Sequence, residues 1–157
     1  QGEMFKLAYT LDLVHVPFGG GGPALQSTVS GHTPLTFAAL PPAIPLVKEN
    51  KLRALAVVGP DRVDALPEVP TMDQAGTPGF DAQTVVLVLA PAGMPRPIVG
   101  LLHTEIAKIL REPEIVQKFS VQGFTAVGST PEQTAARIES ELAMWAKVVR
   151  DGNLQQP

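Results

Sequence analysis

The chain has 157 residues, with 12 Lys plus Arg and 15 Asp plus Glu, so its formal net charge is -3 at pH 7. A hydrophobic content of 45% over this length is enough to bury a core, which excludes an intrinsically disordered chain. The basic side chains are scattered, so we expect no nucleic-acid partner. The absence of cysteine excludes a thiolate nucleophile, a disulfide framework and a cysteine-based metal site.

The longest apolar run, residues 85–91, is shorter than the ~20 residues of a membrane-spanning helix. The opening residues show no basic stretch followed by an apolar one, so we expect no signal peptide within this chain.

Strands and helices are predicted to alternate in the first 58 residues. Apolar, β-branched runs at 13–17, 34–37 and 52–58 are typical of strands. After the first run come four glycines and then a helix that begins near Pro23 and ends at Gly31. A second helix is expected over 41–49, ending at Asn50.

The rest of the chain is predicted to be a loop, two short strands and three helices. Residues 59–79 form a surface loop, interrupted by a helical turn that Thr71 caps and that Gln74 completes as a capping box. Strands are expected at 84–90, buried on both faces, and at 124–127. The helices are predicted from Pro97, from Pro113 and from Pro131 after the cap Thr130, the last one ending at Gly152. Two of them carry apolar stripes that should be buried, which are Ile98, Leu101, Leu102, Ile106 and Ile109, and Ala135, Ile138, Leu142, Trp145 and Val149.

The strongest local feature is the run Gly19, Gly20, Gly21 and Gly22 between a strand and a helix. Backbone without Cβ atoms lets a ligand approach closely, and unpaired N–H groups at a helix start attract a carboxylate or phosphate. The spacing fits neither a phosphate-binding P-loop nor a dinucleotide fingerprint. The residues themselves leave two interpretations open, an anion site or a plain tight turn.

No residue pattern predicts catalysis, a metal site or a cofactor. His15, His32 and His103 are isolated from one another, so neither a zinc site nor a catalytic triad is indicated. We expect His15 to be a hydrogen-bonded structural residue in its strand, and His32 and His103 to be solvated. Trp145 is expected to anchor the core from the last helix.

Several segments, taken together and in order, resemble the Bug-type substrate-binding proteins of tripartite tricarboxylate transporters. The resemblance covers nearly the whole chain. It is carried by Val14-His15-Val16-Pro17-Phe18 with the glycines and Pro23-Ala24-Leu25, by residues 51–57, 66–71, 75–76, 78–80 and 89–93, by Gly128-Ser129-Thr130-Pro131-Glu132-Gln133 and by residues 145–150.

The resemblance implies an α/β fold of the periplasmic-binding-protein type, with two lobes joined by crossing strands. Family members are about twice as long, so this chain corresponds to their later half. Residues 1–83 are then the second lobe with its glycine-rich ligand loop, and residues 84–157 are the crossing strand and the helices that return to the first lobe.

The resemblance also places a ligand site at Phe18, Gly19, Gly20, Gly21 and Gly22 and at Phe37, Ala38 and Ala39, where backbone N–H groups hold a carboxylate. Phe18-Gly19 and Ala38-Ala39 stand where the family usually has Tyr-Lys and Asp-Asn, so this site has lost polar side chains.

Two functions follow from the resemblance. In the first, the chain is a periplasmic, non-catalytic receptor that binds a small carboxylate, without a cofactor, for the membrane permease subunits. In the second, it is a half-length form that does not bind solute and acts through protein contacts or as a homodimer.

Overall fold

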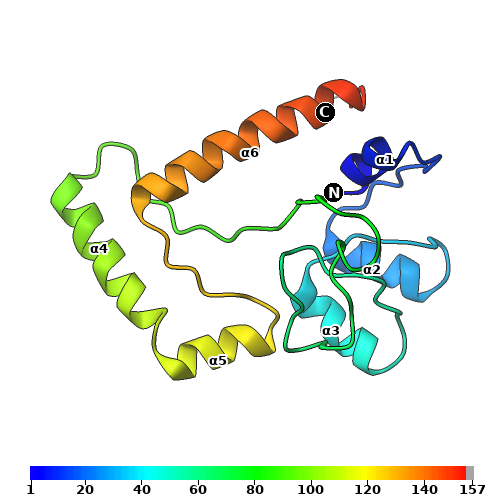
Figure 1. Cartoon of the computed structure of the whole chain (residues 1–157), viewed down its shortest axis with the longest axis horizontal. Helices are drawn as coiled ribbons and strands as arrows, with labels where there is room; N and C mark the ends of the chain where they lie inside the picture. The colour runs from blue at the N-terminus through cyan, green and yellow to red at the C-terminus, as the bar shows by residue number, and fades with distance from the viewer. Residues whose placement is uncertain (155–157) are drawn as a thin grey trace. The chain divides into compact units, whose positions relative to one another are not determined.

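A computed structural model of the chain describes residues 1–154. Its regular secondary structure is helical (Figure 1). The helices are α1 (Gly2–Tyr9), α2 (Gly21–Val29), α3 (Leu40–Lys48), α4 (Arg96–Ile109), α5 (Pro113–Val121) and α6 (Pro131–Asp151). The chain forms two compact units, Gln1–Thr84 with Val121–Phe124, and Val85–Ser120 with the chain from Thr125 onward. The assignment of residues 1–83 and 84–157 to two lobes stays a prediction.

The apolar core lies in the first unit, between α3 and the loop that follows it. Ile44, Val57, Leu66 and Val69 are buried together there. Partly buried side chains surround this cluster, namely Leu40, Val47, Ala54, Val63 and Ala65. The predicted helix over 41–49 is confirmed as α3, and the chain leaves it through Asn50, whose φ is 57°. The core therefore includes a helix that the sequence pattern does predict.

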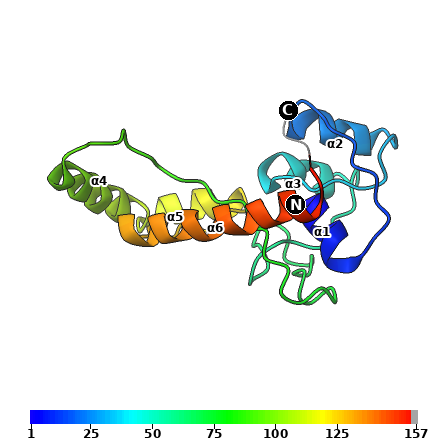
Figure 2. The same ribbon diagram turned by 90° about the horizontal axis from the view of Figure 1, so that it is seen from above.

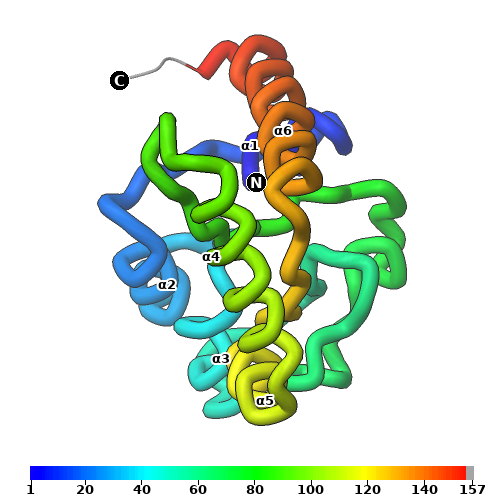
Figure 3. Tube along the Cα trace, turned by 90° about the vertical axis from the view of Figure 1, so that its left-hand side faces the viewer, coloured from blue at the N-terminus to red at the C-terminus, as the bar shows by residue number. Residues whose placement is uncertain are grey.

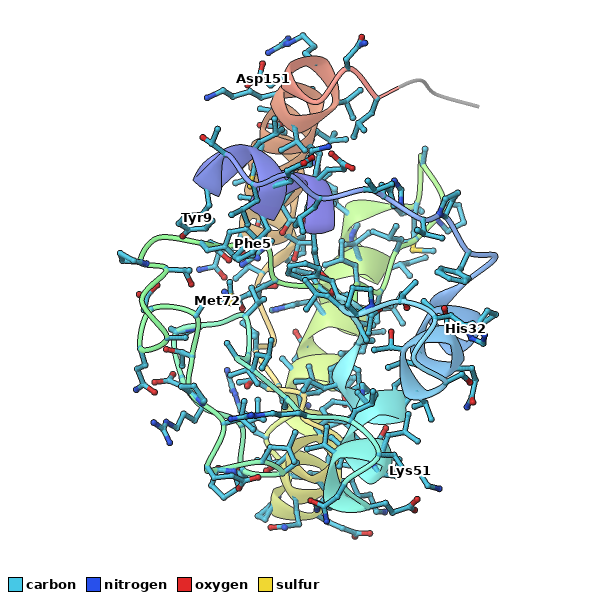
Figure 4. All side chains as sticks on the ribbon, turned by 90° about the vertical axis from the view of Figure 1, so that its right-hand side faces the viewer. Phe5, Tyr9, His32, Lys51, Met72 and Asp151 are labelled. Atoms are coloured by element: carbon cyan, nitrogen blue, oxygen red, sulfur yellow. The ribbon has the colours of Figure 1, made fainter. Side chains whose placement is uncertain are left out.

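An aromatic cluster attaches α1 to distant segments of the first unit. The ring centroid of Phe5 lies 5.0 Å from that of Tyr9, 5.6 Å from that of Phe37 and 5.5 Å from that of Phe80. Figure 4 labels Phe5 and Tyr9 on α1, where both side chains extend from the same helix. The sequence pattern predicts no helix here, because Gln1 provides no side-chain cap and the helix has only 8 residues.

The predicted strands are wrong for residues 1–154, where no strand forms. The predicted ranges are 13–17, 34–37, 52–58, 84–90 and 124–127. Backbone pairing of the β type is confined, in the described chain, to one isolated parallel bridge between Val57 and Thr71. A strand exists only where a neighbour pairs with its N–H and C=O groups, and an apolar run does not specify that neighbour. The predicted α/β class is therefore not observed in this part of the chain.

Helix boundaries follow the predicted capping signals closely. Thr130 caps α6, because its hydroxyl accepts from the Gln133 N–H at 3.2 Å while Gln133 Oε1 accepts from the Thr130 N–H at 2.9 Å. Gly152 follows the last residue of α6, as predicted. Gly31 has the left-handed φ of 76° expected of the stop after α2. These signals are local, so they form whatever the rest of the chain does.

The second unit has almost no core. Among its described residues, Ala107 of α4 is the one buried hydrophobic side chain, and α5 and α6 bury none. The prediction that the stripes of α4 and α6 are buried is therefore wrong. Trp145 is half-buried and does not anchor a core. Figure 3 follows this unit through α4 and α5 and along the extended segment that leads into α6. An amphipathic stripe specifies a face to be covered, and no described element of this unit covers it.

The predicted burial of residues 84–90 is wrong as well. Val86, Val88 and Leu89 are 75%, 76% and 72% exposed. Figure 2 draws this stretch as plain ribbon, without a strand arrow. No neighbour pairs with either of its edges among residues 1–154, and the alternate side chains Val85 and Leu87 are 37% exposed. None of the helices in that range is long and apolar enough to cross a bilayer.

Candidate anion-binding loop

The predicted glycine loop leads directly into α2. Gly20 is the N-cap residue, with φ 154° and ψ 176°, a conformation that a residue with a Cβ rarely adopts. Gly21 and Gly22 are the first two residues of the helix, and all four glycines are exposed. A Cβ built on any of residues 19–22 would meet no atom within 4 Å. The loop thus borders open space into which a ligand could fit.

Unpaired donors gather at the start of α2. Gly20 has no side chain to cap the helix, Pro23 has no N–H, and the Ala24 N–H donates to Gly20 O at 3.3 Å. The N–H groups of Gly21 and Gly22 therefore lack a side-chain cap and point out of the first turn. Two such donors, together with the positive end of the helix dipole, favour an anion.

A hollow of about 580 Å³ lies beside α2. Of the predicted site residues, Phe18 lines it; the other lining residues are Val16, Pro23, Gln26, Ser27, Ser30, His32 and Thr33. Thr33 Oγ1 donates to Ser27 Oγ at 3.2 Å within this lining, and it lies 3.0 Å from Oγ1 of Thr28, which does not line the hollow. Figure 4 shows His32 beside α2 at the edge of the molecule in that view. The sequence does not reveal these hydroxyls as a group, because separate Ser and Thr residues carry no recognisable spacing.

The second predicted segment of the site, residues 37–39, does not line the hollow beside α2. Phe37 belongs to the aromatic cluster, with its ring centroid 6.5 Å from that of Phe80, and does not line the hollow. Ala38 and Ala39 do not line it either, and Ala39 is the N-cap of α3. Pro41 and Pro42 occupy the first turn of α3 and lack N–H groups, so this helix start offers fewer donors than α2 does. The glycine loop is the stronger half of the predicted site.

The loop and its surroundings in sequence carry no ionic side chain. Between Asp12 and Lys48 there is no Asp, Glu, Lys or Arg. An anion here would be held by backbone N–H groups and hydroxyls, and no carboxylate of this stretch would repel it.

The three histidines do not form a site. His15 is exposed, with Nδ1 3.9 Å from Glu3 Oε1, so its predicted place as a structural residue in a strand is wrong. His103 is half-buried rather than solvated, and its buried Nε2 has no hydrogen-bond partner within residues 1–154. The same range holds no group of three or more His, Asp or Glu side chains that could bind a metal ion.

The sequence profile described as the tripartite tricarboxylate transporter family receptor matches residues 1–154. The chain belongs to this family. The resemblance seen in the sequence motifs is thereby confirmed. Members of the family and their structural neighbours are substrate-binding receptors and not enzymes.

Individual relatives support the same placement. Protein BugT of Bordetella pertussis is 35% identical over 149 residues, which cover 95% of this chain. A solved structure described as a periplasmic transporter is 36% identical, with a TM-score of 0.85 over 98% of this chain. An R. palustris protein solved with adipate is 32% identical, with a TM-score of 0.85 over 97% of this chain. These neighbours are periplasmic-binding-protein-like receptors, which supports the predicted architecture at the level of the fold family.

This chain spans about half the length of the proteins that it matches. It covers 46% of BugT, 51% of the periplasmic transporter and 51% of the protein solved with adipate.

Proposed function

We propose that this chain contributes the α2 side of a binding site for a small organic carboxylate. The observation that carries the proposal is the uncapped start of α2, where the N–H groups of Gly21 and Gly22 have no side-chain cap and a Cβ built on either residue would meet no atom within 4 Å. The match to a protein solved with adipate supports a carboxylate as the ligand class. The family supports delivery of that ligand to the membrane permease subunits of a tripartite transporter, and the neighbours support a periplasmic location.

In this proposal, the ligand is held by the backbone of residues 18–22, with the backbone of residues 37–39 as the second contact. A charge-assisted hydrogen bond to a backbone N–H contributes roughly 1.5–3 kcal/mol. Two such bonds without an ionic side chain hold a carboxylate weakly, so the complete site needs further donors. The family usually has polar residues at positions 18–19 and 38–39. Their loss here also means that the complete site needs further donors.

The proposal is tested by titrating the chain with adipate and following backbone amide signals by nuclear magnetic resonance. The signals of Gly21 and Gly22 should move with adipate concentration. Gly21→Pro removes one donor at the first helical position, where proline fits the helix, and should weaken binding about tenfold.

Two controls separate the donor from the side chain. Gly21→Ala also adds a Cβ but keeps the N–H, so it should bind adipate more tightly than Gly21→Pro does. Gly100→Ala makes the same change in α4, where a Cβ also meets nothing. If Gly21→Pro bound adipate as well as Gly21→Ala does, or if only signals outside residues 18–22 and 37–39 moved, the proposed site would be wrong.

A second candidate function is association with another copy of this chain without solute binding. The observation in its favour is the exposed apolar face of α4, where Leu101 is 62% exposed. Light scattering over a range of protein concentrations tests it. A dimer that leaves adipate unbound would support this candidate, whereas a monomer that binds adipate would exclude it.

A further inference from the structure

A second hollow lies at the C-terminal end of α3, and we call it the α3 hollow. Its volume is about 630 Å³, which is within the size range of small-molecule sites. It shares no lining residue with the hollow beside α2. Figure 4 shows Lys51, which lines the α3 hollow, at the end of α3 and apart from His32 beside α2. The function proposed above therefore does not use it.

The apolar lining of the α3 hollow belongs to the core of the first unit. It includes Val47, Ala54 and Val69. Val69 is 5% exposed and is a member of the buried cluster, against which Val47 and Ala54 are packed. A ligand in the α3 hollow would therefore contact apolar side chains that close packing already holds in place.

Three charged side chains also line the α3 hollow, namely Lys51, Arg53 and Glu68. Lys51 is already paired, since its Nζ lies 2.7 Å from Glu49 Oε2. Arg53 and Glu68 are exposed, and neither forms an ion pair or a side-chain hydrogen bond within residues 1–154. The α3 hollow thus offers a guanidinium with its full set of donors and a carboxylate with its full set of acceptors.

Backbone hydrogen bonds fix the turn that carries Arg53. The Lys51 N–H donates to Leu46 O at 2.8 Å, and the Leu52 N–H donates to the same oxygen at 3.1 Å. Both bonds join the turn to the last part of α3. The backbone next to Arg53 is therefore in place before a ligand binds.

The loop that carries Glu68 is fixed in the same way. The Val69 N–H donates to Leu66 O at 3.1 Å, and Arg62 Nη1 donates to Pro67 O at 2.9 Å. These bonds lie on either side of Glu68 in the sequence. Two charged groups on fixed backbone segments lose less conformational freedom on binding than they would on mobile loops.

The lining matches the chemistry of a free amino acid with an apolar side chain. The planar guanidinium of Arg53 can donate two hydrogen bonds to an α-carboxylate, and the carboxylate of Glu68 can accept from an α-ammonium. The apolar lining can then cover the aliphatic side chain. A simple carboxylate would leave Glu68 without a partner, and a simple amine would leave Arg53 without one.

We propose that the α3 hollow binds a zwitterionic amino acid with a branched aliphatic side chain. Arg53 binds its carboxylate, and Glu68 binds its ammonium group. This is a second binding site of the first unit, and it does not depend on carboxylate binding at the glycine loop.

The test is to titrate the full chain with L-leucine and to follow backbone amide signals by nuclear magnetic resonance. The signals of residues 50–54 and 68–69 should move together. 4-Methylpentanoate lacks the ammonium group of leucine, 3-methylbutylamine lacks its carboxylate, and glycine lacks its side chain. Each of the three should bind at these signals about tenfold more weakly than L-leucine does. The signals of Gly21 and Gly22 report carboxylate binding at the glycine loop separately in the same titration.

Charge-removing variants assign the two contacts. Arg53→Gln should weaken L-leucine binding about fivefold and leave 3-methylbutylamine binding unchanged. Glu68→Gln should weaken L-leucine binding by a similar factor and leave 4-methylpentanoate binding unchanged. Lys48→Gln and Asp61→Asn are the matched controls, because both remove an exposed charge that does not line the α3 hollow, and both should bind L-leucine as the parent chain does.

Three results would overturn the proposal. They are equal affinity for L-leucine and 4-methylpentanoate, signal changes confined to residues outside 50–54 and 68–69, and unchanged L-leucine binding by both Arg53→Gln and Glu68→Gln. The comparison of the four ligands uses the parent chain, so it decides the proposal even if a variant fails to fold.

Discussion

Val57 and Thr71 form a parallel β-bridge that closes the loop between them over the core. The Val57 N–H donates to Pro70 O at 2.9 Å, and the Met72 N–H donates to Val57 O at 2.9 Å. Both residues are buried, with exposed fractions of 5% and 2%. The closed loop carries Leu66 and Val69 into the cluster with Val57 and Ile44. The core of the first unit thus depends on a contact between two segments, the predicted strand at 52–58 and the predicted loop at 59–79, whose pairing the sequence pattern does not indicate.

Thr71 should stabilise this loop through its hydroxyl. The hydroxyl accepts from the Gln74 N–H at 3.2 Å, and Gln74 Oε1 accepts from the Thr71 N–H at 3.3 Å and from Arg62 Nε at 2.7 Å. Thr71→Val keeps the shape but removes the acceptor, so we expect the free energy of unfolding in urea to fall by about 1–2 kcal/mol. Thr71→Ser keeps the acceptor and should lose less than Thr71→Val does. Equal stability of the valine variant and the parent chain would contradict this role.

Gly123 should tolerate no side chain. Its φ is 77°, and a Cβ would lie 3.0 Å from both Cβ and Cδ1 of Leu40. Gly123→Ala should lower the free energy of unfolding by about 2–4 kcal/mol, since a left-handed backbone and overpacking both contribute. Gly31→Ala is the matched control, because Gly31 has φ 76° and nothing within 4 Å of a built Cβ. A cost as large at Gly31 would show that backbone conformation alone is responsible.

The two units should respond differently to truncation of a leucine. Leu66 is 2% exposed in the core of the first unit, so Leu66→Ala should destabilise the chain by roughly 2–4 kcal/mol. Leu101 is 62% exposed on α4, so Leu101→Ala should change stability by less than about 0.5 kcal/mol in the chain alone. Urea unfolding followed by circular dichroism measures both. A large loss for Leu101→Ala would mean that α4 is covered in solution.

Glu132 should make the stability of α6 depend on pH. Its own backbone N–H and the Thr130 hydroxyl, with His103 and Arg96 nearby, lower the pKa of this carboxyl below 4.5. A lowered pKa in the folded state means that the ionised carboxylate contributes stability above pH 4.5, and that this contribution is lost as the pH falls through the folded-state value. Glu132→Gln should therefore have a lower Tm than the parent chain at pH 7, and the difference should shrink as the pH falls below 4.5.

The charge-retaining variant Glu132→Asp is the control. It should keep a higher Tm than Glu132→Gln at pH 7, because an acidic side chain remains at the start of α6. A difference between the parent chain and Glu132→Gln that stays the same from pH 7 to pH 3 would exclude an electrostatic cause.

Sequence motifs determined the local structure and the family. The capping box of Thr130 and Gln133 and the left-handed Asn50 that follows α3 are specified by residues within one or two helical turns, so the sequence predicts them where the structure has them. The pair Thr71 and Gln74 forms its predicted reciprocal hydrogen bonds, although the segment is a turn and not a helix. The family motifs likewise needed only order and residue identity.

Tertiary structure decided which apolar segments are buried and which donors remain free. The runs at 52–58 and 84–90 look alike in sequence, yet Val57 is buried against the loop that carries Thr71 while Val86 and Val88 are exposed. A hydrophobic sequence indicates that a segment needs to be buried. The residues that bury it are distant in the chain or belong to another polypeptide. Tertiary structure was also needed for the candidate site. The glycines predicted a loop without side chains. Only the folded chain shows that the N–H groups of Gly21 and Gly22 at the start of α2 have no side-chain cap, and that a Cβ on either residue would lie in open space.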